Sequence, residues 1–148
     1  MQDLKLTIDL LPKGAWGKDF SITLPKKDWD RLRYATYEAA EYQCEICGTK
    51  PETLEAHEVW DFDIPSQTQT LVEIKALCPA CHGVKHFRNS VRIGYGEQAK
   101  HHFMKVNHCG LDTLTRHYLD AESLFEQRNQ VKQWQMKAPL LDDLGIVY

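Results

Sequence analysis

The sequence predicts an α+β fold, in which short strands and several helices enclose a metal-binding centre. Three observations predict it. Apolar and polar residues alternate along some segments, as they do in half-buried strands. Other segments repeat apolar residues at helical spacing. The middle of the chain concentrates cysteines and histidines at spacings that are typical of metal sites.

The chain has 148 residues, which suits one domain over 1–148. We expect 44–90 to form the metal-binding core, with 1–43 and 91–148 packed on it as flanking elements. Hydrophobic residues make up 43% and charged residues 26%, the balance of a globular protein. No run of eighteen apolar residues and no signal-peptide pattern occurs, so we expect a cytoplasmic protein without membrane contact.

The N-terminal part predicts two strands followed by a helix. Apolar residues alternate with polar ones over 4–10 and again over 20–24, which predicts half-buried strands joined through "PKGAWGKD". After Pro25 the apolar residues recur at helical spacing. This change predicts a helix over 27–42 that leads to Cys44.

The centre predicts two strands and a short helix. The strands are "LEAHEVWDF" and "TLVEIKALC", separated by the polar turn "DIPSQTQ", and the helix starts near Pro79. Further helices are predicted over 97–107 and 111–133. Pro139 interrupts the helical pattern, and the tail after it has enough apolar residues to dock on the core.

Two cysteine pairs predict a structural zinc site. Each pair has two residues between its cysteines, which lets both sulfurs bind one tetrahedral ion, and the pairs are Cys44 with Cys47 and Cys78 with Cys81. Gly48 follows the first pair, where such a turn often needs a positive φ. Cys109 stands alone and is interpreted as a small buried apolar residue.

Three histidines predict a second metal site. His82 and His86 are four residues apart, so they share one face of a helix and can reach one ion. His57 lies between the cysteine pairs, on the strand that the zinc would hold against that helix. Three protein ligands with open positions are typical of a catalytic ion.

These motifs resemble those of the HNH endonucleases, the ββα-metal nucleases with an added four-cysteine zinc site. The resemblance rests on "CEICG", "LEAHEVW" and "LVEIKALCPACHGVKH" over about 44–86. The flanking "DLLPKGAW" and "HFMKVN" are also similar to a small bacterial HNH group. The resemblance implies His57, His82 and His86 as ligands of a catalytic divalent ion (Mg²⁺, Mn²⁺, Ni²⁺ or Zn²⁺). It also implies hydrolysis of DNA phosphodiester bonds by an activated water.

The sequence departs from the family pattern at two positions. Glu58 stands where the family has a histidine as general base, and Glu73 stands where it has the asparagine that orients the base. A carboxylate can accept a proton from water, so Glu58 is predicted as the catalytic base. Two alternatives stay open, in which Glu58 binds the metal or simply faces solvent.

Four further residues are weaker candidates for this site. A regular pleat would place Asp61 and Asp63 on the strand face of His57, where they could add to the coordination. His101 and His102 lie on a predicted helix outside the motif and could replace the missing histidine base.

Two functions follow from the sequence. The first is a metal-dependent endonuclease or nickase acting on DNA. The second is a non-catalytic zinc-binding module on the same scaffold, which binds nucleic acid or a protein partner. The net charge of −3 and the pI near 6.1 argue against gripping DNA by charge alone. The basic residues that could contact phosphate are Lys75, Lys85, Arg88, Arg92 and Lys100.

Overall fold

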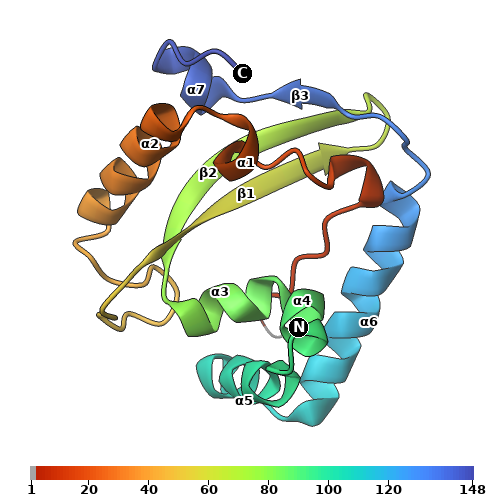
Figure 1. Cartoon of the computed structure of the whole chain (residues 1–148). Coiled ribbons are helices and arrows are strands. Elements are labelled where there is room, and N and C mark those ends of the chain that lie inside the picture. The colour runs from red at the N-terminus through yellow and green to blue at the C-terminus, as the bar shows by residue number, and fades with distance from the viewer. Residues whose placement is uncertain (1–2) are drawn as a thin grey trace.

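The computed structural model describes residues 3–148 and has the predicted α+β architecture (Figure 1). A three-stranded sheet has the order β1-β2-β3. The strands are β1 (Glu55–Asp63), β2 (Thr68–Leu77) and β3 (Gln135–Lys137). The helices are η1 (Lys13–Ala15), α1 (Phe20–Thr23), α2 (Lys26–Ala39), α3 (Pro79–Lys85), α4 (Phe87–Arg92), α5 (Gly96–Asn107), α6 (Leu111–Arg128) and α7 (Pro139–Asp143).

The central hairpin was predicted correctly. β1 and β2 pair antiparallel, and His57 lies opposite Lys75. The register shifts between Val59 and Trp60, which is a β-bulge or a similar irregularity. In the turn, the Asp63 carboxylate accepts a hydrogen bond from the Ser66 backbone N–H at 3.1 Å.

The C-terminal tail docks on the core, as predicted. Just before it, residues 135–137 form β3, which pairs parallel with the first residues of β2. Leu141 on α7 is fully buried, and Ile146 after it is nearly so. The sequence did not predict β3, because three residues are too few for an alternating pattern to stand out.

Both N-terminal strand predictions were wrong. Residues 4–10 form no strand, because their backbone N–H groups bond to helices: those of Lys5 and Leu6 donate to Asn107, and that of Ile8 donates to His117. Residues 20–23 form α1, whose turns close through Asp19 and Phe20 carbonyls. The alternating apolar residues of 4–10 are buried against helices instead of on a sheet.

Several helix boundaries also differ from the prediction. The helix expected over 27–42 ends at Ala39, because Glu41 and Tyr42 adopt positive φ and turn the chain toward Cys44. The helix expected over 111–133 ends at Arg128. A short helix, α4, follows α3 without having been predicted. The helix over 97–107 agrees within one residue.

Two main clusters of buried side chains stabilise the structure on either side of the hairpin. One joins the N-terminal segment and the cysteines to α3, α4, α5 and α6, with Leu6, Leu77 and Phe103 fully buried. The other joins α1, α2 and the tail to β2. Figure 1 shows α3, α4 and α5 below the hairpin with α6 at its right, and α2 and α7 at the upper left. Among residues 3–148, no helix has the length and apolar character needed to cross a bilayer.

Candidate metal centre

Four cysteine sulfurs lie together where the turn after α2 meets the start of α3. Within the described residues the sulfurs of Cys44, Cys47, Cys78 and Cys81 all lie within 4.8 Å of one another, close enough to hold one ion. All four are free thiols. The Cys47 and Cys78 sulfurs are 3.7 Å apart. Sulfurs at about 2.3 Å from a tetrahedral Zn²⁺ would be separated by roughly 3.8 Å.

The local backbone explains why the sulfurs converge. The Cys44 N–H donates to Thr49 and the Gly48 N–H donates back to Cys44, which closes a tight turn around the first pair. Gly48 has φ of +79°, as the sequence predicted, and this conformation strains other residues. Cys78 is the N-cap of α3, and its sulfur accepts the Cys81 N–H at 3.4 Å.

The electrostatics of this cluster fit a bound cation. Burial opposes ionisation of Cys44, yet backbone N–H groups directed at its sulfur lower its pKa to about 7. Burial raises the pKa of Cys78 to about 11, and burial with the neighbouring thiolates raises that of Cys81 further. Thiolates packed this closely repel one another, and a divalent ion offsets that repulsion. The cluster can therefore hold a metal ion, plausibly zinc.

Two further residues border the thiolate cluster. The Nε2 atom of His102 is 3.1 Å from the Cys81 sulfur, so this histidine contacts a candidate zinc ligand. Burial lowers the His102 pKa. Cys109 is half-buried and packs against the core of the same region, outside the four-sulfur group.

Three histidines converge a short distance away. Three ring nitrogens, one from each histidine, all lie within 4.8 Å of one another. The residues are His57, His82 and His86. Their ring centroids are 5.3 Å, 5.3 Å and 4.7 Å apart. His57 comes from β1, His82 from α3 and His86 from the residue that ends α3. The structure thus brings together the three residues that the motif singled out.

The charge state of these histidines suits a cation. Burial lowers the pKa of His86 to about 4, with a further contribution from His82 and His57. Burial also lowers the pKa of His57. Because imidazole binds metals in its neutral form, a lowered pKa keeps the nitrogen lone pair accessible at neutral pH. The three-histidine group therefore fits a divalent ion on its donor chemistry.

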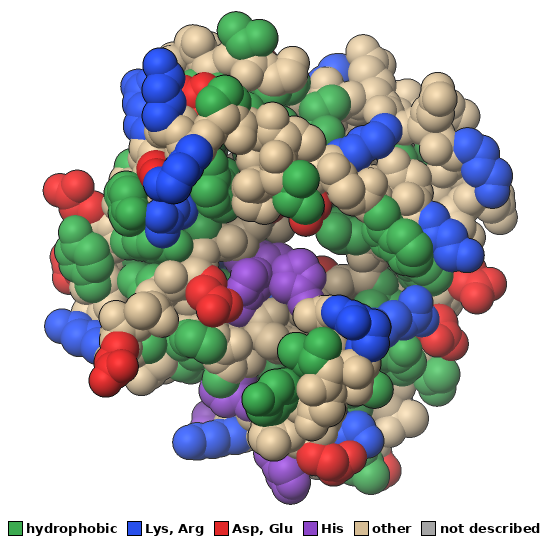
Figure 2. Space-filling model, viewed as in Figure 1, with side chains coloured by type: hydrophobic (Ala, Val, Ile, Leu, Met, Phe, Trp, Pro, Cys, Tyr) green, Lys and Arg blue, Asp and Glu red, His purple; other side chains and the backbone are tan. Residues whose placement is uncertain are grey.

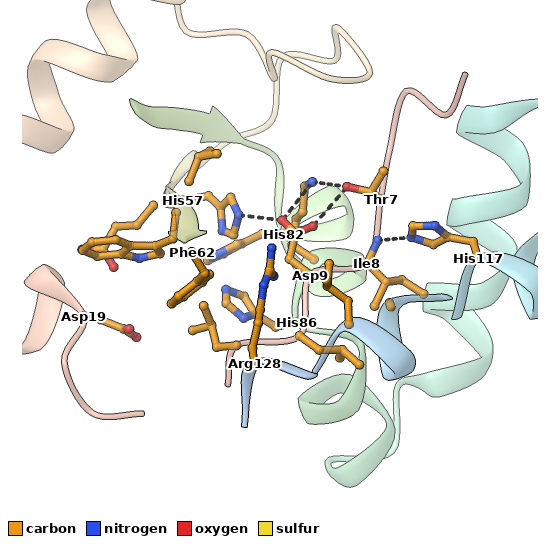
Figure 3. Close-up of a pocket in the computed structure, with 18 of the residues that line it drawn as sticks. Thr7, Ile8, Asp9, Asp19, His57, Phe62, His82, His86, His117 and Arg128 are labelled. Carbon is orange, nitrogen blue, oxygen red and sulfur yellow. Dashed lines mark hydrogen bonds and ion pairs between the residues drawn. The ribbon is translucent and has the colours of Figure 1, made fainter. Parts of the chain in front are cut away.

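The histidines line a cavity of about 530 Å³ between β1, α3, α6 and the N-terminal segment. Figure 2 shows histidine side chains gathered around a hollow at the centre of this face. Two cations line the cavity, Lys85 from α3 and Arg128 from the end of α6. The Arg128 guanidinium lies over the Phe62 ring, 5.0 Å from its centroid, and burial lowers its pKa. Figure 3 shows this side chain pointing toward the histidines.

Glu58 also lines the cavity, and it has a structural partner. Its Oε1 accepts the backbone N–H of Phe20 at 2.6 Å, which ties β1 to the start of α1. Burial, with the nearby Asp19 carboxylate, raises the Glu58 pKa to about 7. Burial raises the Asp19 pKa as well. Glu58 is half-buried at the wall of the cavity, with one carboxylate oxygen bonded to the backbone.

The other weaker candidates do not line this cavity. Glu73 lies opposite Val59 and pairs with Lys75 at 3.4 Å. Asp61 is exposed and does not line the cavity. Asp63 is used in the hairpin turn. His101 is exposed on α5.

Two carboxylates that the sequence did not single out contact the histidines. The Asp9 Oδ2 atom is 3.5 Å from the His57 Nε2 atom, and the Glu55 Oε1 atom is 2.7 Å from the His82 Nδ1 atom. Burial opposes ionisation of Asp9, but His57 and Lys85 outweigh it and lower the Asp9 pKa to about 2. The one sequence feature that could have drawn attention to Asp9 is the "DLLPKGAW" segment, which begins at this residue. Its spacing to His57 gave no reason to connect the two residues.

Comparison of the chain with known protein families, with curated proteins and with solved structures finds no match. The resemblance to the HNH endonucleases therefore rests on the sequence motifs alone.

Proposed function

We propose that this protein is a metal-dependent endonuclease or nickase of the HNH type, which hydrolyses phosphodiester bonds of DNA. The observation that carries the proposal is the convergence of His57, His82 and His86 within 4.8 Å at the wall of a cavity. A strand histidine facing two histidines of the following helix is the arrangement that the HNH resemblance implies. The thiolate group beside it would hold a structural zinc that fixes the hairpin against α3.

The chain's own residues have separable roles in this proposal. The three histidines would hold a divalent ion, which when bound supplies Lewis-acid stabilisation of charge on the phosphate. Arg128 and Lys85 line the same cavity and can donate hydrogen bonds to a phosphate. Glu58 lines it too, and it is proposed to accept the proton of a water in the cavity.

A second function has an observation in its favour. The Glu58 carboxylate is engaged by the Phe20 N–H, and Glu73 lies outside the cavity. If both positions are purely structural, the chain is a non-catalytic zinc-binding module that binds nucleic acid or a protein partner. The free thiols suit a reducing compartment, which supports proposing a cytoplasmic location for either function.

Plasmid cleavage tests the proposal. Purified protein is incubated with supercoiled plasmid and Mg²⁺, Mn²⁺, Ni²⁺ or Zn²⁺ in turn, and nicked and linear products are quantified. We expect cleavage by the parent with at least one metal and none by His82→Ala. His101→Ala is the matched control, because His101 is exposed outside the cavity, and it should cut like the parent. Absence of cleavage with every metal would favour the binding module.

A further inference from the structure

The carboxylates of Asp9 and Glu55 each face one of the three histidines. We propose that Asp9 and Glu55 are positioning residues of the three-histidine site, each fixing which ring nitrogen of its histidine faces the ion. Asp9 comes from the N-terminal segment and Glu55 from the first residue of β1. The inference deepens the proposed function and rests on it for the identity of the ion site.

The His57 ring has a buried nitrogen without a hydrogen-bond partner among residues 3–148, and Asp9 can supply the acceptor. The His57 side chain is 5% exposed, and within the described chain its Nε2 atom is buried without a hydrogen-bond partner. Leaving such an atom unbonded costs about 1–3 kcal/mol. The Asp9 Oδ2 atom at 3.5 Å lies just beyond the usual N–H···O range of about 2.7–3.2 Å. A small rotation of either side chain would complete the bond.

Asp9 is itself held in place, so that it can act on His57. Its Oδ2 atom is 3.2 Å from the Lys85 ammonium, and its Oδ1 atom accepts the Thr7 hydroxyl at 3.1 Å. Lys85 in turn donates to the Thr7 hydroxyl at 2.8 Å, and the Asp9 backbone N–H donates to the Lys85 carbonyl at 3.2 Å. Figure 3 shows this network beside His57. A carboxylate held by two side chains, on a residue whose backbone is also bonded, restricts the ring it contacts.

The second pair follows the same logic with the opposite nitrogen. The His82 Nδ1 atom lies 2.7 Å from Glu55, a fully formed hydrogen bond. A neutral imidazole carries one N–H and one lone pair, and an ionised carboxylate only accepts. The proton is therefore placed on Nδ1 of His82 and on Nε2 of His57. This leaves the Nε2 lone pair of His82 and the Nδ1 lone pair of His57 for the ion.

Such pairs have a measurable effect in metal sites. A carboxylate that accepts the second ring N–H fixes the ring orientation and makes the ligand nitrogen more basic, and its loss typically lowers metal affinity about 10–100-fold. Glu55 lies within the "LEAHEVW" motif but at none of its ligand positions, and Asp9 lies 48 residues before His57. The site therefore depends on the N-terminal segment as well as on the hairpin and α3.

Nuclear magnetic resonance of ¹⁵N-histidine-labelled protein tests the proton positions. The parent protein, loaded with one zinc at the thiolates, is measured before and after a second equivalent of Zn²⁺, with signals assigned by His57→Ala and His82→Ala. We expect protonated Nε2 in His57 and protonated Nδ1 in His82 in both samples. A proton on Nδ1 of His57, or on Nε2 of His82, overturns the proposal.

Calorimetric titration of the second zinc tests the consequence. Asp9→Asn and Glu55→Gln should each weaken that binding by roughly 10–100-fold while the thiolate zinc is retained. The matched controls are Asp143→Asn and Glu52→Gln, two exposed carboxylates away from the cavity, and both should bind like the parent. Asp9→Glu keeps a carboxylate and should recover part of the affinity that Asp9→Asn loses.

The two proposals fail in different ways. If the parent binds a second zinc and both variants bind it equally well, the positioning roles are overturned and the ion site stands. If the parent binds no second zinc, the proposed function loses its support. The proton positions in the protein without that ion then still decide whether the two carboxylates hold the rings.

Discussion

The Glu58 side chain combines a structural contact with a position at the cavity wall. Its carboxylate accepts the Phe20 N–H and also lines the cavity beside His57. A side chain that only held α1 would need an acceptor but no negative charge. Glutamine keeps the acceptor and removes the charge, so Glu58→Gln separates the two roles.

We expect Glu58→Gln to lower plasmid cleavage by about 10²–10⁴-fold, the usual cost of removing a general base. The amide oxygen can still accept the Phe20 N–H, so the midpoint of thermal unfolding should stay near that of the parent. Cleavage rate and unfolding are measured on the same preparations. Parent-like cleavage would show that the base is elsewhere, with His102 the next residue to test.

Arg128 lines the cavity, and its guanidinium lies over the Phe62 ring. If it contacts the DNA phosphate, Arg128→Gln removes a charge-assisted hydrogen bond, which corresponds to a loss of roughly 10–100-fold in kcat/KM. The slope of the logarithm of DNA affinity against the logarithm of salt concentration should also decrease by about one, the value for one lost phosphate contact. Arg116→Gln is the control, because Arg116 is exposed on the same helix and does not line the cavity. Equal losses in both variants would contradict a local contact.

The N-terminal segment and α5 are joined by one side chain. Asn107, the last residue of α5, accepts the N–H groups of Lys5 and Leu6 and donates to the Leu6 carbonyl. These bonds replace the strand pairing that the alternating sequence had suggested. The segment that carries Asp9 is therefore anchored by helices, by α5 through Asn107 and by α3 and α6 through Lys85 and His117, rather than by the sheet.

Asn107→Ala should lower the free energy of unfolding by about 1–3 kcal/mol or more, because it leaves buried backbone groups of Leu6 unbonded. Urea unfolding followed by circular dichroism measures the change. Asn89→Ala, at an exposed position of α4, serves as the control and should change little. A parent-like midpoint for Asn107→Ala would mean that the segment is held by its apolar contacts alone.

The thiolate cluster joins parts of the chain that are thirty residues apart. Cys44 and Cys47 belong to the turn after α2, whereas Cys78 and Cys81 belong to the start of α3. The metal-binding free energy of such a site is folding free energy. Loss of the ion should therefore affect the position of the hairpin, α3 and the three histidines together.

We expect a strong chelator to remove one zinc per chain and to abolish most of the native circular dichroism, with recovery on adding Zn²⁺ back. Metal content is measured by mass spectrometry on the same samples. Cys109→Ser should keep its zinc, because Cys109 is outside the four-sulfur group. A chain that stays folded without zinc would remove the structural role proposed for the cluster.

The sequence by itself determined the local chemistry. The cysteine pairs, the His82–His86 spacing and the position of Gly48 are set by a few neighbouring residues, and the structure places them as expected. The β1–β2 hairpin and the helices α3 and α5 also follow from local periodicity. A feature that depends only on residues close together in the sequence can be predicted from their spacing.

The tertiary structure decided what the flanking segments contribute. The alternating residues of 4–10 could bury their apolar side chains on a sheet or on helices, and only the packed helices decide between the two. The same packing delivers Asp9 to His57 and Arg128 to the cavity, across separations in sequence that no local pattern encodes. Asp61, on the same strand as His57, stays exposed outside the cavity. Such placements depend on how distant segments pack into one core. The free energy of burial depends on the apolar area removed from water and not on the separation of residues in the sequence.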